Sequence, residues 1–173
     1  MRNILSTSKL SIILLISIYS SISCADEDGS KIFKTWYGSE RPGVSAVNFQ
    51  QYTEICGSCH FPYQPGLLPA VSWKKVMSNI DNHFGESLIL SSIESRTMTR
   101  YLLDNSAGHV NDGISLNILQ SLKYDSIVMR VTKTPYFVKT HSQLNDTDKI
   151  KDIGQCNSCH KDAAQGVYDL SLD

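Results

Sequence analysis

The chain has 173 residues, of which 16 are basic, 17 are acidic and 41% are hydrophobic. Without residues 1–25, which contain two basic residues and no acidic one, the remaining 148 carry a net charge of −3. A chain of this length forms one small domain or two very small ones. Its charge argues against nucleic acid and anionic membrane surfaces as partners, and it suits a basic docking face on another protein.

The first 25 residues have the three parts of a secretory signal peptide: a basic start, a continuously apolar run at residues 12–16, and small residues after it. The apolar run is too short for a transmembrane helix, which needs about 20 such residues. We therefore expect cleavage after Ala25 and export to the periplasm of a Gram-negative bacterium. Lipid attachment at Cys24 is the alternative, because the residues before it resemble the end of a lipobox.

A polar leader segment, residues 26–46, is expected to have little regular structure. Residues 47–60 are predicted to form the first helix, and its buried face would include Val47, Tyr52, Ile55 and Cys59. Prolines then make residues 62–69 an extended loop, in which Leu67 and Leu68 are candidates for contact with a cofactor.

Two further helices are predicted from apolar stripes. One begins near Ser72 and buries Trp73, Val76, Met77 and Ile80. The other runs from residue 91 to about residue 105, because Ser91 and Glu94 have the spacing of a capping box. Its inward-facing residues would be Ile93, Met98, Tyr101 and Leu102.

The pattern changes beyond residue 105. A short helix is expected at residues 114–122, and residues 124–134 mix β-branched and basic residues before Pro135, which interrupts any strand there. We place a boundary near residue 124, so that a helical domain at 47–124 precedes a C-terminal module at 125–173.

Two pentapeptides share the pattern C-x-x-C-H, at residues 56–60 and 156–160. On one helical turn, the two cysteines and the histidine point into one pocket. The thiols can then form thioethers to a porphyrin while the histidine reaches its iron, which is the pattern of c-type haem attachment. A four-cysteine zinc site and disulfides are the alternatives. A zinc ribbon needs no histidine after each pair, and its pairs are separated by only about 15–20 residues.

Two of the five histidines, His60 and His160, belong to the motifs, which leaves three for the sixth position on each iron. His83 follows the Trp73 helix, from which the chain could return over the first haem, and His141 lies 15 residues before Cys156. Imidazole suits iron, so these two are the favoured ligands. His109 is expected in a surface loop. Met77 and Met98 could supply a thioether instead, but their positions on helix stripes favour core packing.

Two imidazoles on each iron predict low-potential, six-coordinate haems with no free site for a small ligand. The sequence has no nucleophile–base constellation and no phosphate loop, so we expect an electron-transfer protein that relays one electron at a time rather than an enzyme. A different class stays open, in which one five-coordinate haem senses or transforms oxygen, nitric oxide or peroxide. A carbonyl in the loop at residues 65–69 is a candidate acceptor for the ring N–H of His60.

The order of haem helix, proline-rich loop, Trp-bearing helix and capped helix resembles the small cytochrome c fold. Residues 52–73 and 81–86 closely resemble the DHC-type dihaem cytochrome c family, and residues 134–137, His141 and the terminal motif resemble its second half. The resemblance covers residues 48–165. It implies a mostly α-helical protein, with a cytochrome c-like N-terminal domain and a C-terminal haem module that has little regular structure.

The resemblance also implies two covalently bound haem c groups, each with two histidine ligands. Carried onto this chain, haem 1 would be held by Cys56, Cys59, His60 and His83, and haem 2 by Cys156, Cys159, His160 and His141. Members of the family are thought to be soluble periplasmic carriers that donate electrons to SHP, a small oxygen-binding mono-haem cytochrome. An aromatic residue between the haems would fit the family, and Tyr52 and Tyr63 are candidates.

Overall fold

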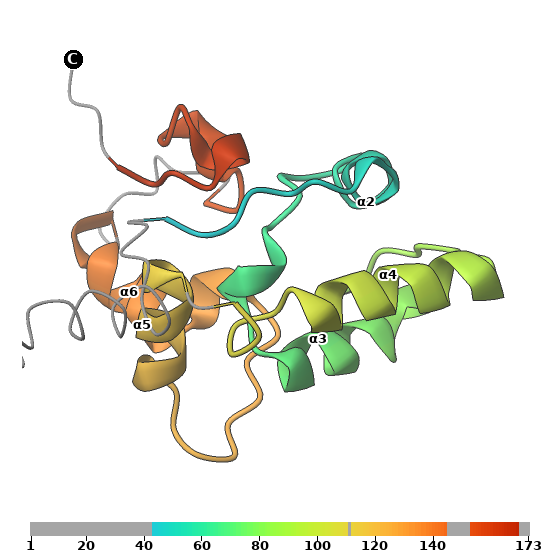
Figure 1. The fold of residues 1–173 in the computed structure, drawn as a ribbon, viewed down its shortest axis with the longest axis horizontal. Coiled ribbons are helices and arrows are strands. Elements are labelled where there is room, and N and C mark those ends of the chain that lie inside the picture. Colours follow the sequence, from blue (N-terminus) through green and yellow to red (C-terminus); the bar gives the residue numbers. More distant parts are fainter. Residues whose placement is uncertain (1–42, 111, 145–152, 170–173) are drawn as a thin grey trace, which may run out of the picture.

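Helices are the regular elements of the part of the chain that the computed structural model describes, which comprises residues 43–110, 112–144 and 153–169 (Figure 1). No strand forms in these ranges, where β pairing is limited to isolated bridges. The predicted mostly α-helical class is confirmed. The predicted signal peptide, Cys24 and most of the leader segment lie outside the described residues. The α-helices are α2 (Gln50–Cys56), α3 (Ala70–Met77), α4 (Ser92–Asp104), α5 (Gly113–Ser121) and α6 (Pro135–Thr140).

Helices α3 and α4 run side by side and form the main helical pair (Figure 1). The predicted capping box begins α4: the Ser91 hydroxyl accepts from the Glu94 N–H at 3.2 Å, and Glu94 Oε2 accepts from the Ser91 N–H at 2.8 Å. These bonds lower the pKa of the Glu94 carboxyl. Met98 and Leu102 of α4 are fully buried, as predicted. Ile93, in the first turn of α4, is not buried: its side chain is 69% exposed.

Helix α2 is shorter than the predicted helix at residues 47–60. It begins at Gln50 and ends at Cys56, so the first pentapeptide begins at its last residue. A Cβ at Gly57 would lie 2.3 Å from the carbonyl oxygen of Thr53, so the chain needs glycine where it leaves the helix. Tyr52 is buried as predicted, but Cys59 is exposed because the helix has ended before it.

Helices α5 and α6 pack together beside the 3₁₀ helix Pro65–Leu67. Helix α6 was not predicted. Thr134 is its N-cap and its hydroxyl accepts from the Phe137 N–H at 3.2 Å, while Pro135 takes the first helical position. A threonine followed by proline is a helix-start signal, so Pro135 begins a helix and does not interrupt a strand.

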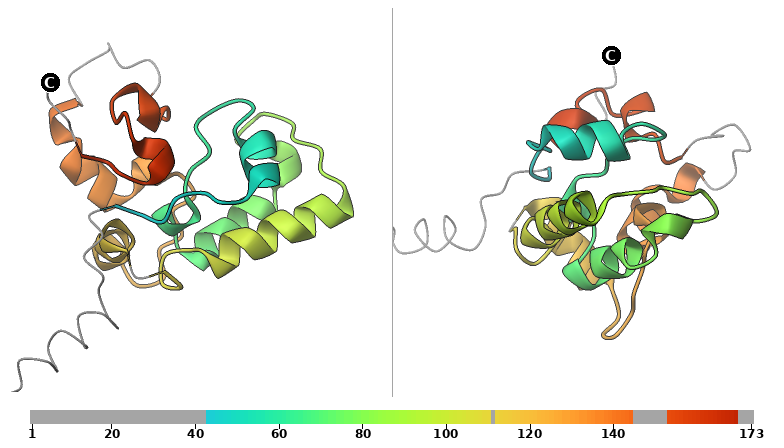
Figure 2. Two further views of the ribbon diagram at one scale, coloured as in Figure 1. Left: turned by 45° about the horizontal axis from the view of Figure 1, so that its top comes forward. Right: turned by 90° about the vertical axis from the view of Figure 1, so that its right-hand side faces the viewer.

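The C-terminal segment, residues 153–169, returns to the first half of the chain (Figure 2). The Val44 N–H donates to the Gly166 carbonyl at 2.9 Å. Gly166 has φ +80°, and a Cβ there would lie 1.8 Å from the Val44 carbonyl oxygen, so only glycine permits this approach. Nearby, the fully buried side chain of Gln64 donates to the Ala163 carbonyl at 2.5 Å. These contacts cross the predicted boundary at residue 124, whose position stays a prediction.

Candidate haem-binding sites

Site 1, defined by Cys56, Cys59, His60 and His83, lies where α2 meets the loop after α3. The rings of His60 and His83 have centroids 6.1 Å apart and are inclined by 19°. Both side chains are partly buried. The structure thus brings together the two histidines that were predicted for the first iron.

A tight turn at residues 83–86 holds His83. The His83 N–H donates to the Glu86 carbonyl at 2.7 Å, and the Glu86 N–H donates back to the His83 carbonyl at 3.2 Å. The central residues Phe84 and Gly85 have φ of +56° and +107°, the combination that a two-residue turn with two left-handed positions requires. A phenylalanine there is unusual, and its ring contacts the His83 ring at 4.8 Å.

The ring N–H of His60 has a backbone partner. Its Nδ1 donates to the Phe61 carbonyl at 2.7 Å, which leaves Nε2 free for a metal. The prediction of an acceptor in the loop at residues 65–69 is therefore wrong. The Pro65 carbonyl in that loop accepts from the indole N–H of Trp73 at 2.7 Å instead.

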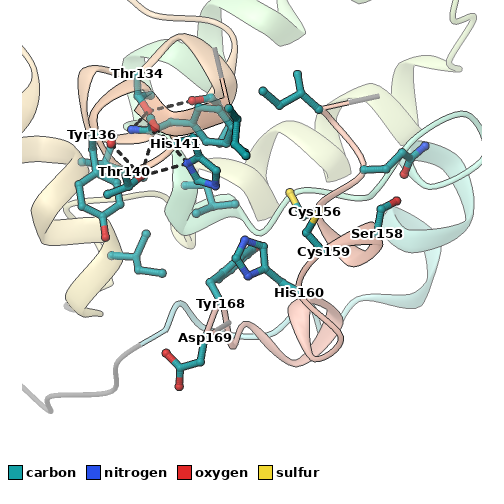
Figure 3. Close-up of a pocket in the computed structure, with 18 of the residues that line it drawn as sticks. Thr134, Tyr136, Thr140, His141, Cys156, Ser158, Cys159, His160, Tyr168 and Asp169 are labelled. Carbon is teal, nitrogen blue, oxygen red and sulfur yellow. Dashed lines mark hydrogen bonds between the residues drawn. The ribbon is translucent and has the colours of Figure 1, made fainter. Parts of the chain in front are cut away.

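Site 2, defined by Cys156, Cys159, His160 and His141, lines a cavity of about 470 Å³ (Figure 3). This volume falls in the usual range for bound small molecules. Much of its wall is apolar, including Leu67, Ile114, Ile118 and Val131. Leu67, a candidate for cofactor contact, therefore lies in the wall of the cavity beside the second motif.

His141 lies at the C-terminal end of α6 and faces His160 across this cavity (Figure 3). Their ring centroids are 6.1 Å apart and the rings are inclined by 85°. The Nδ1 of His141 donates to the Phe137 carbonyl one turn earlier at 3.0 Å, which again leaves Nε2 free. The Phe137 ring stacks on His141 with centroids 3.9 Å apart and an inclination of 12°.

Two observations fit a metalloporphyrin in these sites. Imidazoles bound to opposite sides of one metal, each by a bond of about 2 Å, have centroids roughly 6 Å apart, and both pairs match this separation. The cavity at site 2 is large and mostly apolar. At His160, unlike His60 and His141, the buried Nδ1 has no hydrogen-bond partner among the described residues.

Burial favours the uncharged forms of one cysteine and one histidine in each site. It raises the pKa of the Cys56 and Cys156 thiols to about 11. It is also the main cause that lowers the pKa of His83 and of His141 below the usual value. Neighbouring groups add to this lowering: His60 and Arg130 for His83, and His160 for His141. Neutral imidazole is the form that binds a metal.

The geometry of the four motif cysteines bears on the two alternatives, disulfides and a four-cysteine zinc site. None of the four motif cysteines is in a disulfide in the structure, and Cys59 and Cys159 are exposed. Within the described ranges, no three His, Cys, Asp or Glu side chains converge on one point. The two motifs therefore do not combine into a four-cysteine site of the zinc-ribbon type.

The remaining candidate ligands lie elsewhere. His109 is exposed, and its Nδ1 lies 2.9 Å from the Ser106 hydroxyl. Met77 and Met98 are buried in the hydrophobic core between α3 and α4, as their stripe positions predicted.

Aromatic side chains flank the motif histidines. The rings of His60 and Tyr63 have centroids 5.3 Å apart, and the Tyr52 hydroxyl donates to the Tyr63 carbonyl at 2.6 Å. Burial is the main cause that raises the pKa of Tyr52 well above its usual value. The sequence analysis missed Tyr168, whose ring lies 5.4 Å from that of His160 and whose hydroxyl donates to Gln64. A single tyrosine close to the chain end carries no pattern that would have indicated it.

Solved structures that resemble this chain are dihaem cytochromes c. A dihaem cytochrome c from Rhodobacter sphaeroides has a TM-score of 0.63 and 26% identity, and the alignment covers 72% of this chain and 99% of that one. A second structure, of DHC purified from Rhodobacter sphaeroides, has a TM-score of 0.55 and 25% identity, over 70% and 98% of the two chains. A dihaem cytochrome c from Shewanella baltica has a TM-score of 0.52 and 29% identity, over 69% and 85%.

A search of curated proteins returned no match. None of the helices in the described ranges combines the length and the apolar character needed to cross a bilayer. The family model for dihaem cytochrome c matches residues 52–168, which is most of the chain. The chain therefore belongs to the dihaem cytochrome c family, whose chemistry is haem-based electron transfer.

Proposed function

We propose that this protein relays single electrons through two covalently bound haem c groups, each held between two histidines. Cys56 and Cys59 would attach the first haem, with His60 and His83 on its iron. Cys156 and Cys159 would attach the second, with His160 and His141. The observation that carries the proposal is the same in both sites: the ring of the motif histidine and the ring of a histidine distant in sequence have centroids 6.1 Å apart.

The bound haems supply the one-electron chemistry, and the protein residues supply orientation and burial. In each site a backbone carbonyl accepts from a histidine Nδ1, Phe61 for His60 and Phe137 for His141. Such a bond fixes the ring orientation and directs Nε2 at the metal. The apolar wall around the second motif favours a porphyrin and limits the access of water to it.

The exposed cysteines support exchange of electrons with a partner protein. Cys59 and Cys159 both lie at the surface, so the porphyrin edge attached to each would also lie close to the surface. A partner docked there would reach the haem without a conformational change. We propose a periplasmic location and a redox partner of the SHP kind, a small oxygen-binding mono-haem cytochrome.

The test is to express the full chain in a host that attaches c-type haem, and then to measure its mass and its spectra. The exported protein should carry two porphyrin masses, and its oxidised form should give two low-spin bis-imidazole signals by electron paramagnetic resonance (EPR). Carbon monoxide should leave the spectrum of the reduced protein unchanged. Prompt carbon monoxide binding would instead support a five-coordinate haem and a small-ligand function, and a colourless product would contradict haem binding altogether.

A further inference from the structure

One hydrogen bond joins the two residues that flank the haem-attachment motifs. The backbone N–H of Phe61, the residue after His60, donates to Oε1 of Gln155, the residue before Cys156, at 2.8 Å. Phe61 is only 5% exposed, and Gln155 lies in the wall of the site 2 cavity. The bond links positions 94 residues apart in sequence.

This bond extends a second one, and together they connect the metal-binding groups. The Phe61 carbonyl accepts from His60 Nδ1 at 2.7 Å, while the N–H of the same residue donates to Gln155. A path through covalent and hydrogen bonds therefore runs from the His60 ring through Phe61 and the Gln155 side chain to the backbone of Cys156. The hydrogen bonds that Val44 and Gln64 make with Gly166 and Ala163 lie farther along the chain from both motifs.

We propose that Gln155 is a positioning residue that holds the two attachment motifs as one rigid unit and thereby sets the rate of electron exchange between the two haems. This inference rests on the relay proposed above. Electron tunnelling is faster through bonded and hydrogen-bonded atoms than across gaps, and it falls steeply with separation. In the exchange, one iron is oxidised by one electron and the other is reduced by one, while no proton or other atom moves.

The test is the exchange rate in half-reduced protein, measured from the broadening of haem methyl signals by nuclear magnetic resonance. Gln155→Leu keeps the size of the side chain but removes the acceptor, and we expect slower exchange. Gln155→Glu keeps an acceptor oxygen and should restore the wild-type rate. Gln165→Leu is the matched control, because Gln165 is exposed in the same segment and its backbone N–H donates to the Asp162 carbonyl rather than to either motif, and this variant should exchange as the wild type does.

Exchange that is unchanged in Gln155→Leu, or equally slowed in Gln165→Leu, would overturn the role of Gln155. If the leucine variant does not take up both haems, Gln155→Asn serves instead, because its shorter side chain cannot span the 2.8 Å contact. EPR on the same samples separates the two proposals. Wild-type protein without two bis-imidazole signals contradicts the relay, whereas two intact signals with unchanged exchange in the variant contradict only the inference about Gln155.

Discussion

His83 and His141 face their partner imidazoles at the same ring separation, but the chain brings them there by different means. His83 precedes a two-residue turn whose central residues both have positive φ. His141 caps a short helix and is bonded to the carbonyl one turn earlier. The position of His83 relies on an unusual backbone conformation, whereas that of His141 relies on ordinary helical geometry.

Both histidines nevertheless contact a phenylalanine, and the origin of that contact differs. Phe137 is four residues before His141 on α6, so helix periodicity places the two rings together. Phe84 is the next residue after His83 and is 41% exposed. The guanidinium of Arg130 lies 3.9 Å from the centre of its ring. The position of His83 therefore depends on a distant segment, whereas that of His141 is set mainly by its own helix.

Removal of each distant histidine should have the largest effect, because it removes a ligand outright. His83→Ala and His141→Ala should each abolish one of the two low-spin EPR signals and allow carbon monoxide to bind one of the two reduced haems. His109→Ala is the control, since its exposed ring contacts Ser106 rather than another histidine, and it should keep both signals. If His141→Ala retained two bis-imidazole signals, the ligand assignment at site 2 would be wrong.

The same two variants should also show which of the two EPR signals comes from site 1 and which from site 2, because the two signals should differ in shape. Imidazole planes that are nearly parallel, as the 19° inclination at site 1 indicates, donate into the same iron d orbital and separate the orbital energies. Planes at 85° leave these orbitals nearly equal in energy. We therefore expect a rhombic signal to disappear in His83→Ala and a signal with a larger maximum g value to disappear in His141→Ala. The reverse assignment would contradict the ring orientations.

Gly85→Ala tests the turn that positions His83. The position has φ +107° and no atom within 4 Å of an added Cβ, so the cost is backbone strain alone. We expect a loss of about 1–2 kcal/mol in the free energy of unfolding, the cost of placing an L-residue with a side chain in a left-handed conformation, measured by denaturant titration. Gly85→Asn is the control, because asparagine tolerates positive φ, and its loss should be smaller. Equal losses in both variants would show that the turn conformation is not the cause.

Thr134→Ala tests the helix that positions His141. It removes the N-cap of α6, whose hydroxyl is fully buried and bonded to both the Phe137 N–H and the Val131 carbonyl. Loss of such a cap costs about 1 kcal/mol, and because α6 is short, the change should reach His141. We expect the site 2 EPR signal to broaden while the site 1 signal is unchanged. Thr134→Ser keeps the hydroxyl and should resemble the wild type; broadening of the site 1 signal alone would contradict this role of α6.

Local patterns explain what could be predicted from the sequence. The capping box at Ser91 and the apolar stripe that buries Met98 depend on residues three and four apart, so they are visible in a short window. Helix α6 was equally visible, since Thr134 and Pro135 form a standard start signal. The prediction differs from the structure because proline both interrupts strands and begins helices, and at residue 135 the second role applies.

Long-range contacts explain most of what could not be predicted. The Phe61–Gln155 bond and the approach of Gly166 to Val44 join segments about a hundred residues apart, and no spacing rule indicates them. The same is true of Leu67, which reaches the second motif only because residues 153–169 return to the first half. In this protein the motifs identify the cofactor, whereas the folded chain determines which distant residues surround it.

Arg130→Gln should have the smallest effect of the four mutational tests. It tests most directly whether a distant segment helps to position His83, as the contact between Arg130 and Phe84 indicates for site 1. A cation over an aromatic face at an exposed position contributes about 0.5–1 kcal/mol, which corresponds to a roughly two- to five-fold change in an equilibrium. Without that contact the Phe84 ring is less restrained, and His83 should leave the iron more readily. We expect a rise of that size in the binding of added imidazole or carbon monoxide at site 1, followed by optical titration.

The specificity of the Arg130 effect follows from the structure of the loop. Lys123→Gln removes a charge from the same exposed segment, but no aromatic ring lies under Lys123 among the described cation–ring contacts, so it should leave ligand binding unchanged. Arg130→Lys keeps the charge but loses the planar group that stacks on the ring, and it should fall between the wild type and Arg130→Gln. Site 2 should not respond to any of these changes, because Phe137 holds His141 from within its own helix. An equal response at both sites would mean that Arg130 acts through the net charge of the protein rather than through Phe84.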